Sequence, residues 1–128
     1  AIDGDGNVLA GGLFYHSGDT QFCGSVAKFD GTSWSQVGTC APGGVNALVV
    51  NGTNIYAAGS GICSYAYVQQ FDGTDWTYLG SAFGNMDVLS IKGGYLYVGG
   101  EFNGISVPQN SASAIEAVAT LAPKCCGR

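Results

Sequence analysis

Basic side chains are scarce in this chain of 128 residues. There are four of them against nine acidic residues, and the formal net charge is −5. A surface that follows nucleic-acid phosphates needs clustered Lys and Arg, so we expect no nucleic-acid partner. No apolar run approaches the roughly 18 residues of a membrane-spanning helix, so we expect no membrane span. The chain also has no initiator Met and no signal peptide, which predicts a mature, excised or partial product.

The residues that carry most catalytic and metal chemistry are equally sparse. His16 is the only histidine and there is no Cys-x-x-Cys pair, which argues against a structural zinc site. Asp3, Asp5 and Asn7 alternate as calcium ligands can, but the distal Glu is missing and a polar turn uses the same residues. The acids lie mostly at turns rather than as a converging pair, and no nucleophile elbow is present. We therefore expect no enzyme, no metal and no cofactor.

Glycine, in contrast, is abundant, and it punctuates short apolar runs. The chain has 22 glycines, 46% hydrophobic residues and only 10% charged residues. The segment Phe29-Asp30-Gly31-Thr32-Ser33-Trp34 recurs at residues 71–76 as Phe-Asp-Gly-Thr-Asp-Trp. Asp-Gly between aromatic residues predicts a β-hairpin, because Gly supplies a positive φ and Asp caps the turn. This composition and these turns predict an all-β protein.

A second pattern, an apolar strand, a polar turn and a Gly-ended strand, occurs three times. It covers residues 1–12, 45–59 and 86–100, and the second and third copies are offset by 41 residues. With the aromatic hairpin, one unit is four short antiparallel strands. We expect a first, partial unit at residues 1–44, a second at 45–85 and a third, degenerate unit with a C-terminal tail at 86–128.

Four strands in a period of about forty residues are typical of a β-propeller blade, which buries its faces by stacking on copies of itself. Glycines are expected where units approach closely or a strand ends, namely Gly11, Gly12, Gly59, Gly99 and Gly100. The strings VAKFDGTSWSQVG, VNALVV and LYVGGEFNG resemble kelch-type, galactose-oxidase-like propeller repeats of secreted and cell-surface proteins. The resemblance implies blades over residues 1 to about 120 and no particular activity. The Tyr, Cys and His metal site of the copper-oxidase member does not map onto this chain.

The third unit departs from the pattern. Repeat register predicts a strand at residues 113–120, whereas Ser113 and Glu116 form a capping box that favours a helix. No Asp-Gly-Thr-x-Trp hairpin follows in this unit. About ten strands, or two and a half to three blades, cannot close a ring that needs four or more. We therefore expect an incomplete ring, completed by further blades of the same polypeptide or by copies of this chain.

Five cysteines indicate an oxidising, extracellular or cell-surface location. In the first aromatic hairpin the numbers of opposed residues sum to 63, which places Cys23 opposite Cys40 and predicts a disulfide between them. A bulge would shift that register, and buried thiols are the alternative. The same argument places Gly84 opposite Cys63. Cys63 is therefore expected to pair with Cys125 or Cys126, or to stay free.

Three further features bear on ligands. Asn51-Gly52-Thr53 is a glycosylation sequon, and Asn-Gly is equally the expected turn. Loop and strand-entry aromatics that could stack on sugars are Tyr15, His16, Tyr65 and Tyr67. We expect a non-catalytic extracellular repeat module for structural assembly or protein interaction, with a carbohydrate-binding, lectin-like propeller as the alternative.

Overall fold

The computed structural model describes residues 1–13, 16–17, 20–21, 26–38, 43–60, 65–106 and 115–119. Every regular element within these ranges is a β-strand, which confirms the all-β prediction. A small sheet has the order β1-β4-β5, and a six-stranded sheet has the order β11-β10-β9-β8-β7-β6. The small sheet consists of β1 (Val8–Gly11), β4 (Val26–Phe29) and β5 (Trp34–Gln36). The large sheet consists of β6 (Gly44–Asn51), β7 (Asn54–Ser60), β8 (Tyr65–Phe71), β9 (Trp76–Lys92), β10 (Tyr95–Ser106) and β11 (Ile115–Ala119).

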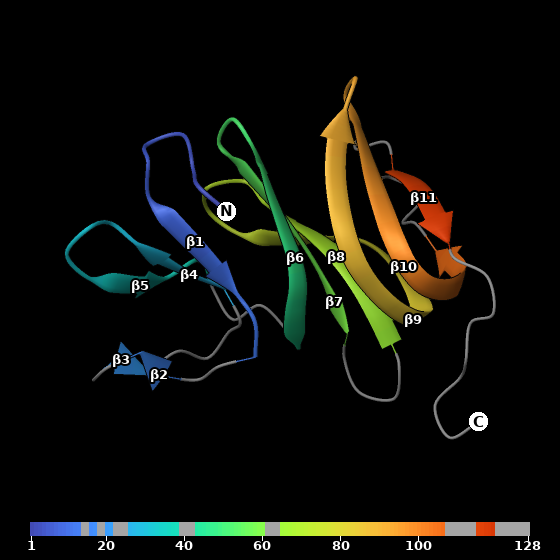
Figure 1. Cartoon of the computed structure of the whole chain (residues 1–128), viewed down its shortest axis with the longest axis horizontal. Coiled ribbons are helices and arrows are strands. Elements are labelled where there is room, and N and C mark those ends of the chain that lie inside the picture. The colour runs from blue at the N-terminus through green and yellow to red at the C-terminus, as the bar shows by residue number, and fades with distance from the viewer. Residues whose placement is uncertain are drawn as a thin grey trace.

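The remaining two strands, β2 (His16–Ser17) and β3 (Thr20–Gln21), form a short antiparallel pair of their own. Figure 1 shows the small sheet standing beside β6, while the large sheet curls through the long, curved strands β9 and β10.

The two aromatic hairpins have the same local structure. Asp30 Oδ1 accepts hydrogen bonds from the backbone N–H groups of residues 32 and 33, and Asp72 Oδ1 does the same for residues 74 and 75. The glycine after each Asp has a positive φ, 98° at Gly31 and 102° at Gly73. Such a φ is easy only for glycine. The flanking rings also contact each other, with centroids 5.1 Å apart in the first hairpin and 5.3 Å in the second. The predicted turn chemistry is therefore confirmed in both copies.

Strand pairing lines up the two hairpins with their neighbouring strands in two matching rows. The N-terminal row is Ile2, Val8, Phe29 and Trp34, each paired with the next across the sheet. The junction row is Val50, Ile55, Phe71 and Trp76, paired in the same way. Directly paired residues of antiparallel strands share one face of the sheet. Each row is therefore an apolar stripe across four segments.

These rows define structural units, which stack face to face. The first unit is the Ile2 bridge with β1, β4 and β5. The second is β6, β7, β8 and residues 76–83 of β9, and the third is residues 84–92 of β9 with β10 and β11. One core lies between the first two units: Leu9, Val26, Val37, Val45, Ile55 and Ala57, flanked by Leu48, Val50, Phe71 and Trp76. The other lies between the second and third: Ala58, Ala66, Val68, Leu79, Ala82, Met86, Leu96, Val98 and Phe102, flanked by Val49, Tyr56, Leu89 and Ile91.

Strand β7 shows how the second unit is buried on both sides. Its residues alternate between the two cores, with Ile55 and Ala57 in one and Tyr56 and Ala58 in the other. Side chains of a strand point to opposite faces in turn, so each face of β7 meets a different neighbouring unit.

Strand β9 joins the second and third units more directly than the sequence predicts. The sequence places the boundary between the second and third units at residues 85 and 86, but β9 runs across it without a break for 17 residues. Gly84 makes this possible: its φ is +124°, and the backbone of Glu101 and Phe102 lies where its Cβ would be. Residues 76–83 of β9 pair with β8, and residues 81–92 pair with β10. One strand therefore serves both units.

The third unit also differs from a regular blade in its pairing. Residues 115–119 form β11, so the strand predicted within residues 113–120 is confirmed there and the helical alternative is wrong. β11 runs parallel to β10, however, beginning with Ile115 opposite Leu96. In a regular four-stranded antiparallel unit the corresponding strand runs antiparallel. The degenerate sequence of this unit thus goes with a changed strand direction.

Candidate binding cavity between the first two units

One tryptophan forms a hydrogen bond across the junction between the first and second units. Trp76, at the end of the junction row, donates a hydrogen bond from Nε1 to the backbone carbonyl of Val37, 2.9 Å away. Gly38 allows this approach: a Cβ there would lie 2.7 Å from the Phe71 ring and 3.0 Å from Trp76 Nε1. A backbone-to-backbone hydrogen bond also crosses the junction, from the Val45 N–H to the Gly12 carbonyl oxygen at 3.0 Å. The two units are therefore fixed to each other at two places.

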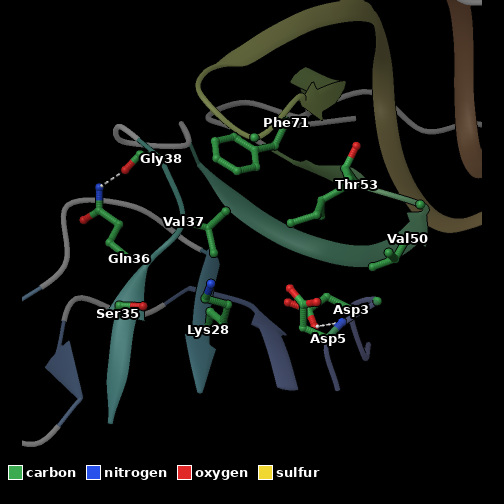
Figure 2. A pocket seen from close by; sticks show the side chains of 14 residues that line it. Asp3, Asp5, Lys28, Ser35, Gln36, Val37, Gly38, Val50, Thr53 and Phe71 are labelled. Carbon is green, nitrogen blue, oxygen red and sulfur yellow. Dashed lines mark hydrogen bonds between the residues drawn. The ribbon is translucent and has the colours of Figure 1, made fainter. Parts of the chain in front are cut away.

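A cavity of about 520 Å³ opens beside this junction. That volume lies within the range of roughly 300–1,000 Å³ typical of small-molecule sites. Its apolar lining includes Val37, Val50, Ile55 and Phe71, and its polar lining includes Asp3, Asp5, Lys28, Ser35, Gln36 and Thr53. Figure 2 shows Phe71 and Thr53 from the second unit on the opposite side to Ser35 and Lys28 from the first. The cavity thus combines an aromatic wall with hydroxyl, amide, ammonium and carboxylate groups.

The charged groups of the cavity come from the N-terminal turn, with two carboxylates, and from β4, with one ammonium group. Asp3 accepts hydrogen bonds from the Asn7 side chain at 2.9 Å and from the backbone N–H groups of Asn7 and Asp5 at 2.8 and 3.0 Å. The Asn7 side chain is the main cause of a lowered Asp3 pKa, and the positive charge of Lys28 adds to it. Asp3 therefore caps the N-terminal turn, which is the polar-turn interpretation of the Asp3, Asp5 and Asn7 pattern. Asp5 and Lys28 are the other two charged groups that line the cavity.

Two tyrosines that the sequence marks as sugar-stacking candidates behave differently. Tyr67 is buried, and its hydroxyl donates a hydrogen bond to the Gly44 carbonyl at 3.2 Å. Burial raises the Tyr67 pKa to about 12. Tyr65, in contrast, is exposed and packs edge-to-face on Phe83 with ring centroids 5.5 Å apart. The structure therefore leaves Tyr65 available to a ligand and gives Tyr67 a packing role.

Phe83 is a surface aromatic that was not predicted from the sequence. It pairs with Tyr65 on one side and with Asn103 on the other, so the three lie in one row across β8, β9 and β10. In the structure exposed Phe83 and Asn85 alternate with buried residues 82, 84 and 86. The position of Phe83 in this alternating pattern is its only signal in the sequence. Recognising that alternation requires knowing that β9 continues through residues 81–85.

Of the other predicted site residues, two lie within the described part of the chain and the rest lie outside it. Asn51 is exposed at the end of β6, directly before the Gly52–Thr53 turn, so the turn interpretation of Asn-Gly is confirmed. His16 lies in β2, for which the structure describes the backbone only. The remaining ones lie outside the described residues: Tyr15, Cys23, Cys40, Cys63, Cys125 and Cys126. The disulfide and glycosylation assignments stay predictions.

The two ends of the stack expose apolar side chains. In the N-terminal row Ile2 is 59% exposed and Val8 is 42% exposed, whereas Ile55 at the corresponding place in the junction row is 8% exposed. At the other end Val88 and Tyr95 are exposed on the third unit.

Among the described residues no group of three His, Cys, Asp or Glu side chains could hold a metal ion, and no helix is long and apolar enough to cross a membrane.

Comparisons of the chain with protein-family models, curated proteins and solved structures gave no match. The geometry of the units, the cavity and the exposed ends is therefore the basis on which a function can be inferred.

Proposed function

We propose that this chain is a non-catalytic assembly module, built from kelch-like propeller blades and acting outside the cell or at its surface. The observation that carries the proposal is the burial of the second unit on both faces, one against each neighbouring unit. A repeat unit of this kind gains stability chiefly from its neighbours. The outer units each have one neighbour among the described residues, so further units or copies of the chain are the partners that complete the stack.

The proposal of a kelch-type blade is supported by the repeated local structure. Both Asp-Gly hairpins have the same capping bonds and the same ring contact, and both end an apolar row of four residues. The extracellular location is supported by the five cysteines and by the exposed sequon at Asn51.

The mass of the particle in solution tests the assembly proposal. We expect light scattering and sedimentation velocity to give a mass above the 13.0 kDa of one chain, decreasing toward that value on dilution. Circular dichroism in the same samples should show β-structure throughout. A folded, monodisperse 13.0 kDa particle at every concentration would contradict the proposal.

Carbohydrate binding is the second candidate, and the cavity is the observation that favours it. A sugar presents an apolar face and a polar edge. The cavity is lined by the Phe71 ring, by the hydroxyl-bearing Thr53 and by the charged residues Asp5 and Lys28. Ring contacts of this kind, with a few convergent polar groups, are typical of small-molecule sites. The exposed Tyr65–Phe83 pair is a separate, open surface for the same chemistry.

A glycan array followed by titration tests the carbohydrate candidate. Tryptophan fluorescence is a suitable signal, because Trp76 packs beside Phe71 at the cavity wall. Binding in the cavity predicts a loss of affinity in Thr53→Ala and Asp5→Ala and none in Tyr65→Ala, whereas binding at the open aromatic pair predicts the reverse. An array with no saturable ligand would exclude the candidate for the sugars tested.

A further inference from the structure

The N-terminal row is a structural copy of a surface that is already an interface within this chain. Each of its four residues has the strand pairing of its counterpart in the junction row. The junction row packs against the first unit, where its residues belong to or flank a buried core. The N-terminal row has the same side-chain chemistry, with Ile2, Val8, Phe29 and Trp34 in place of Val50, Ile55, Phe71 and Trp76. Ile2 and Val8 are exposed, whereas Phe29 and Trp34 are half-buried, as Phe71 and Trp76 are. The same kind of surface therefore packs on a neighbouring unit in one place and, among the described residues, on none in the other.

The two tryptophans show most clearly how the N-terminal row and the junction row correspond. Trp76 crosses to the first unit and donates its indole N–H to the Val37 carbonyl. Trp34 makes the same ring contact with its neighbouring phenylalanine. Among the described residues, however, no neighbouring unit lies beyond Trp34 to supply a carbonyl. A buried indole normally finds a hydrogen-bond acceptor, so the half-buried Trp34 would take one from a partner chain that covers it.

The opposite end of the stack presents the other half of such a contact. In the second unit the face turned toward the third includes Tyr56. The 41-residue offset relates Tyr56 to Tyr97 of β10, which is half-buried. Strand pairing places Val88, opposite Gly99, on the same face as Tyr97. We call this surface the exit face; it holds Val88, Tyr95 and Tyr97 together with Ser90 and Lys92, the strand partners of the two tyrosines.

We propose that the N-terminal row is a docking surface for the exit face of a second copy of this chain, so that copies associate head to tail through a Trp34 contact equivalent to that of Trp76. The proposal rests on the assembly function proposed above and adds its surface and polarity. A contact between two different faces is heterologous, so repetition gives a ring where the rotation closes and a filament where it does not. The row has no charged member, so apolar burial is its main source of affinity.

Single substitutions at the two faces test the location. Val8→Glu puts a charge into the N-terminal row, and Tyr97→Glu puts one into the exit face. Each should weaken association at least about tenfold, because burying an unpaired carboxylate is strongly unfavourable. Thr74→Glu is the matched control, since it adds the same charge at an exposed hairpin turn of the second unit, away from both faces. It should leave association unchanged. Sedimentation velocity measures all three, with circular dichroism of each variant as the check on folding.

A mixing experiment tests the polarity. Val8→Glu keeps an intact exit face, and Tyr97→Glu keeps an intact N-terminal row. Neither should self-associate, but an equimolar mixture should form a 1:1 dimer that grows no further. A mixture that stays monomeric would overturn the head-to-tail contact. Association blocked by Val8→Glu but unaffected by Tyr97→Glu would also overturn it, because a different surface would then cover the row.

Trp34→Phe provides a milder variant that keeps the row apolar. Loss of one hydrogen bond should weaken association about two- to tenfold without changing the urea unfolding of the diluted monomer. Trp76→Phe, its counterpart, should instead lower the stability of the monomer. If wild-type chains associate and neither Trp34→Phe nor Val8→Glu has an effect, the docking surface is wrong and the assembly function stands. If wild-type chains do not associate, the assembly function itself fails.

Discussion

Replacing Gly11 by alanine should destabilise the junction between the first two units. Gly11 ends β1, and a Cβ built on it would lie 2.6 Å from Val45 Cγ1 and 2.9 Å from Leu48 Cδ1. Carbon atoms in contact prefer roughly 3.5–4.0 Å. Val45 is buried and β-branched, so it has little freedom to move, whereas half-buried Leu48 can change rotamer. Overpacking of this kind typically costs about 1–3 kcal/mol.

Urea unfolding, followed by tryptophan fluorescence in dilute protein, measures this cost. The expected result is a lower midpoint with an unchanged slope, and a melting temperature lower by roughly 4 °C for each kcal/mol. Gly4→Ala is the control, because the nearest atom to its added Cβ is the Gly52 carbonyl oxygen at 3.8 Å, an ordinary contact. It should be neutral or slightly stabilising. If Gly11→Ala is as stable as the wild type, β1 and β6 do not approach as closely as described.

Three further predictions concern acid, alkali and disulfides. Backbone hydrogen bonds lower the pKa values of Asp30 and Asp72. Their contribution to stability is therefore present above the unfolded pKa near 3.9 and lost as pH falls through the lower folded value. Asp72→Ala should therefore make the free energy of unfolding depend less on pH between about pH 2 and 6. Tyr67, with its pKa raised to about 12, contributes stability below about pH 10 that is lost between about pH 10 and 12, and Tyr67→Phe should remove the late step of a tyrosine absorbance titration. Peptide mapping without reduction should recover a Cys23–Cys40 link, and free, alkylated Cys23 would end that prediction.

The sequence predicts the fold well where structure depends on near neighbours. The Asp-Gly hairpins are determined by a capping carboxylate and the glycine that follows it in each copy, so Asp30 and Asp72 suffice to predict both turns. Close approach at Gly11 also follows from the pattern of Gly-ended strands, and it is confirmed.

The sequence does not predict features that depend on distant backbone. In the second hairpin, the numbers of residues paired between β8 and β9 sum to 147 from the turn to the pair of Gln69 and Tyr78. Beyond it, from the pair of Val68 and Gly80, they sum to 148, because Leu79 is an extra residue in β9. No residue type marks that bulge. In the first hairpin the described pairing extends only to Ala27, opposite residue 36, and keeps the predicted sum of 63.

The binding cavity is likewise not predictable from the sequence. Its walls come from the N-terminal turn, two strands of the first unit and segments of the second, and they range from Asp3 to Gly73 along the chain. Lys28 and Thr53 look like ordinary surface residues in the sequence, and only the stacking of the two units places them at one opening. The parallel direction of β11 is a third such feature, because the apolar pattern of a strand carries no information on its direction.

Hydrogen exchange of the two indole N–H groups tests the central claim, that one apolar row is used twice, most directly. The chain has only Trp34 and Trp76, so a nitrogen-15 spectrum resolves one indole signal from each, assigned with Trp34→Phe. The Trp76 signal should exchange slowly at every protein concentration, because its acceptor is the Val37 carbonyl of the same chain. The Trp34 signal should exchange fast in dilute protein and become protected as concentration rises. Equal exchange of the two groups, or protection of Trp34 that does not depend on concentration, would contradict the claim.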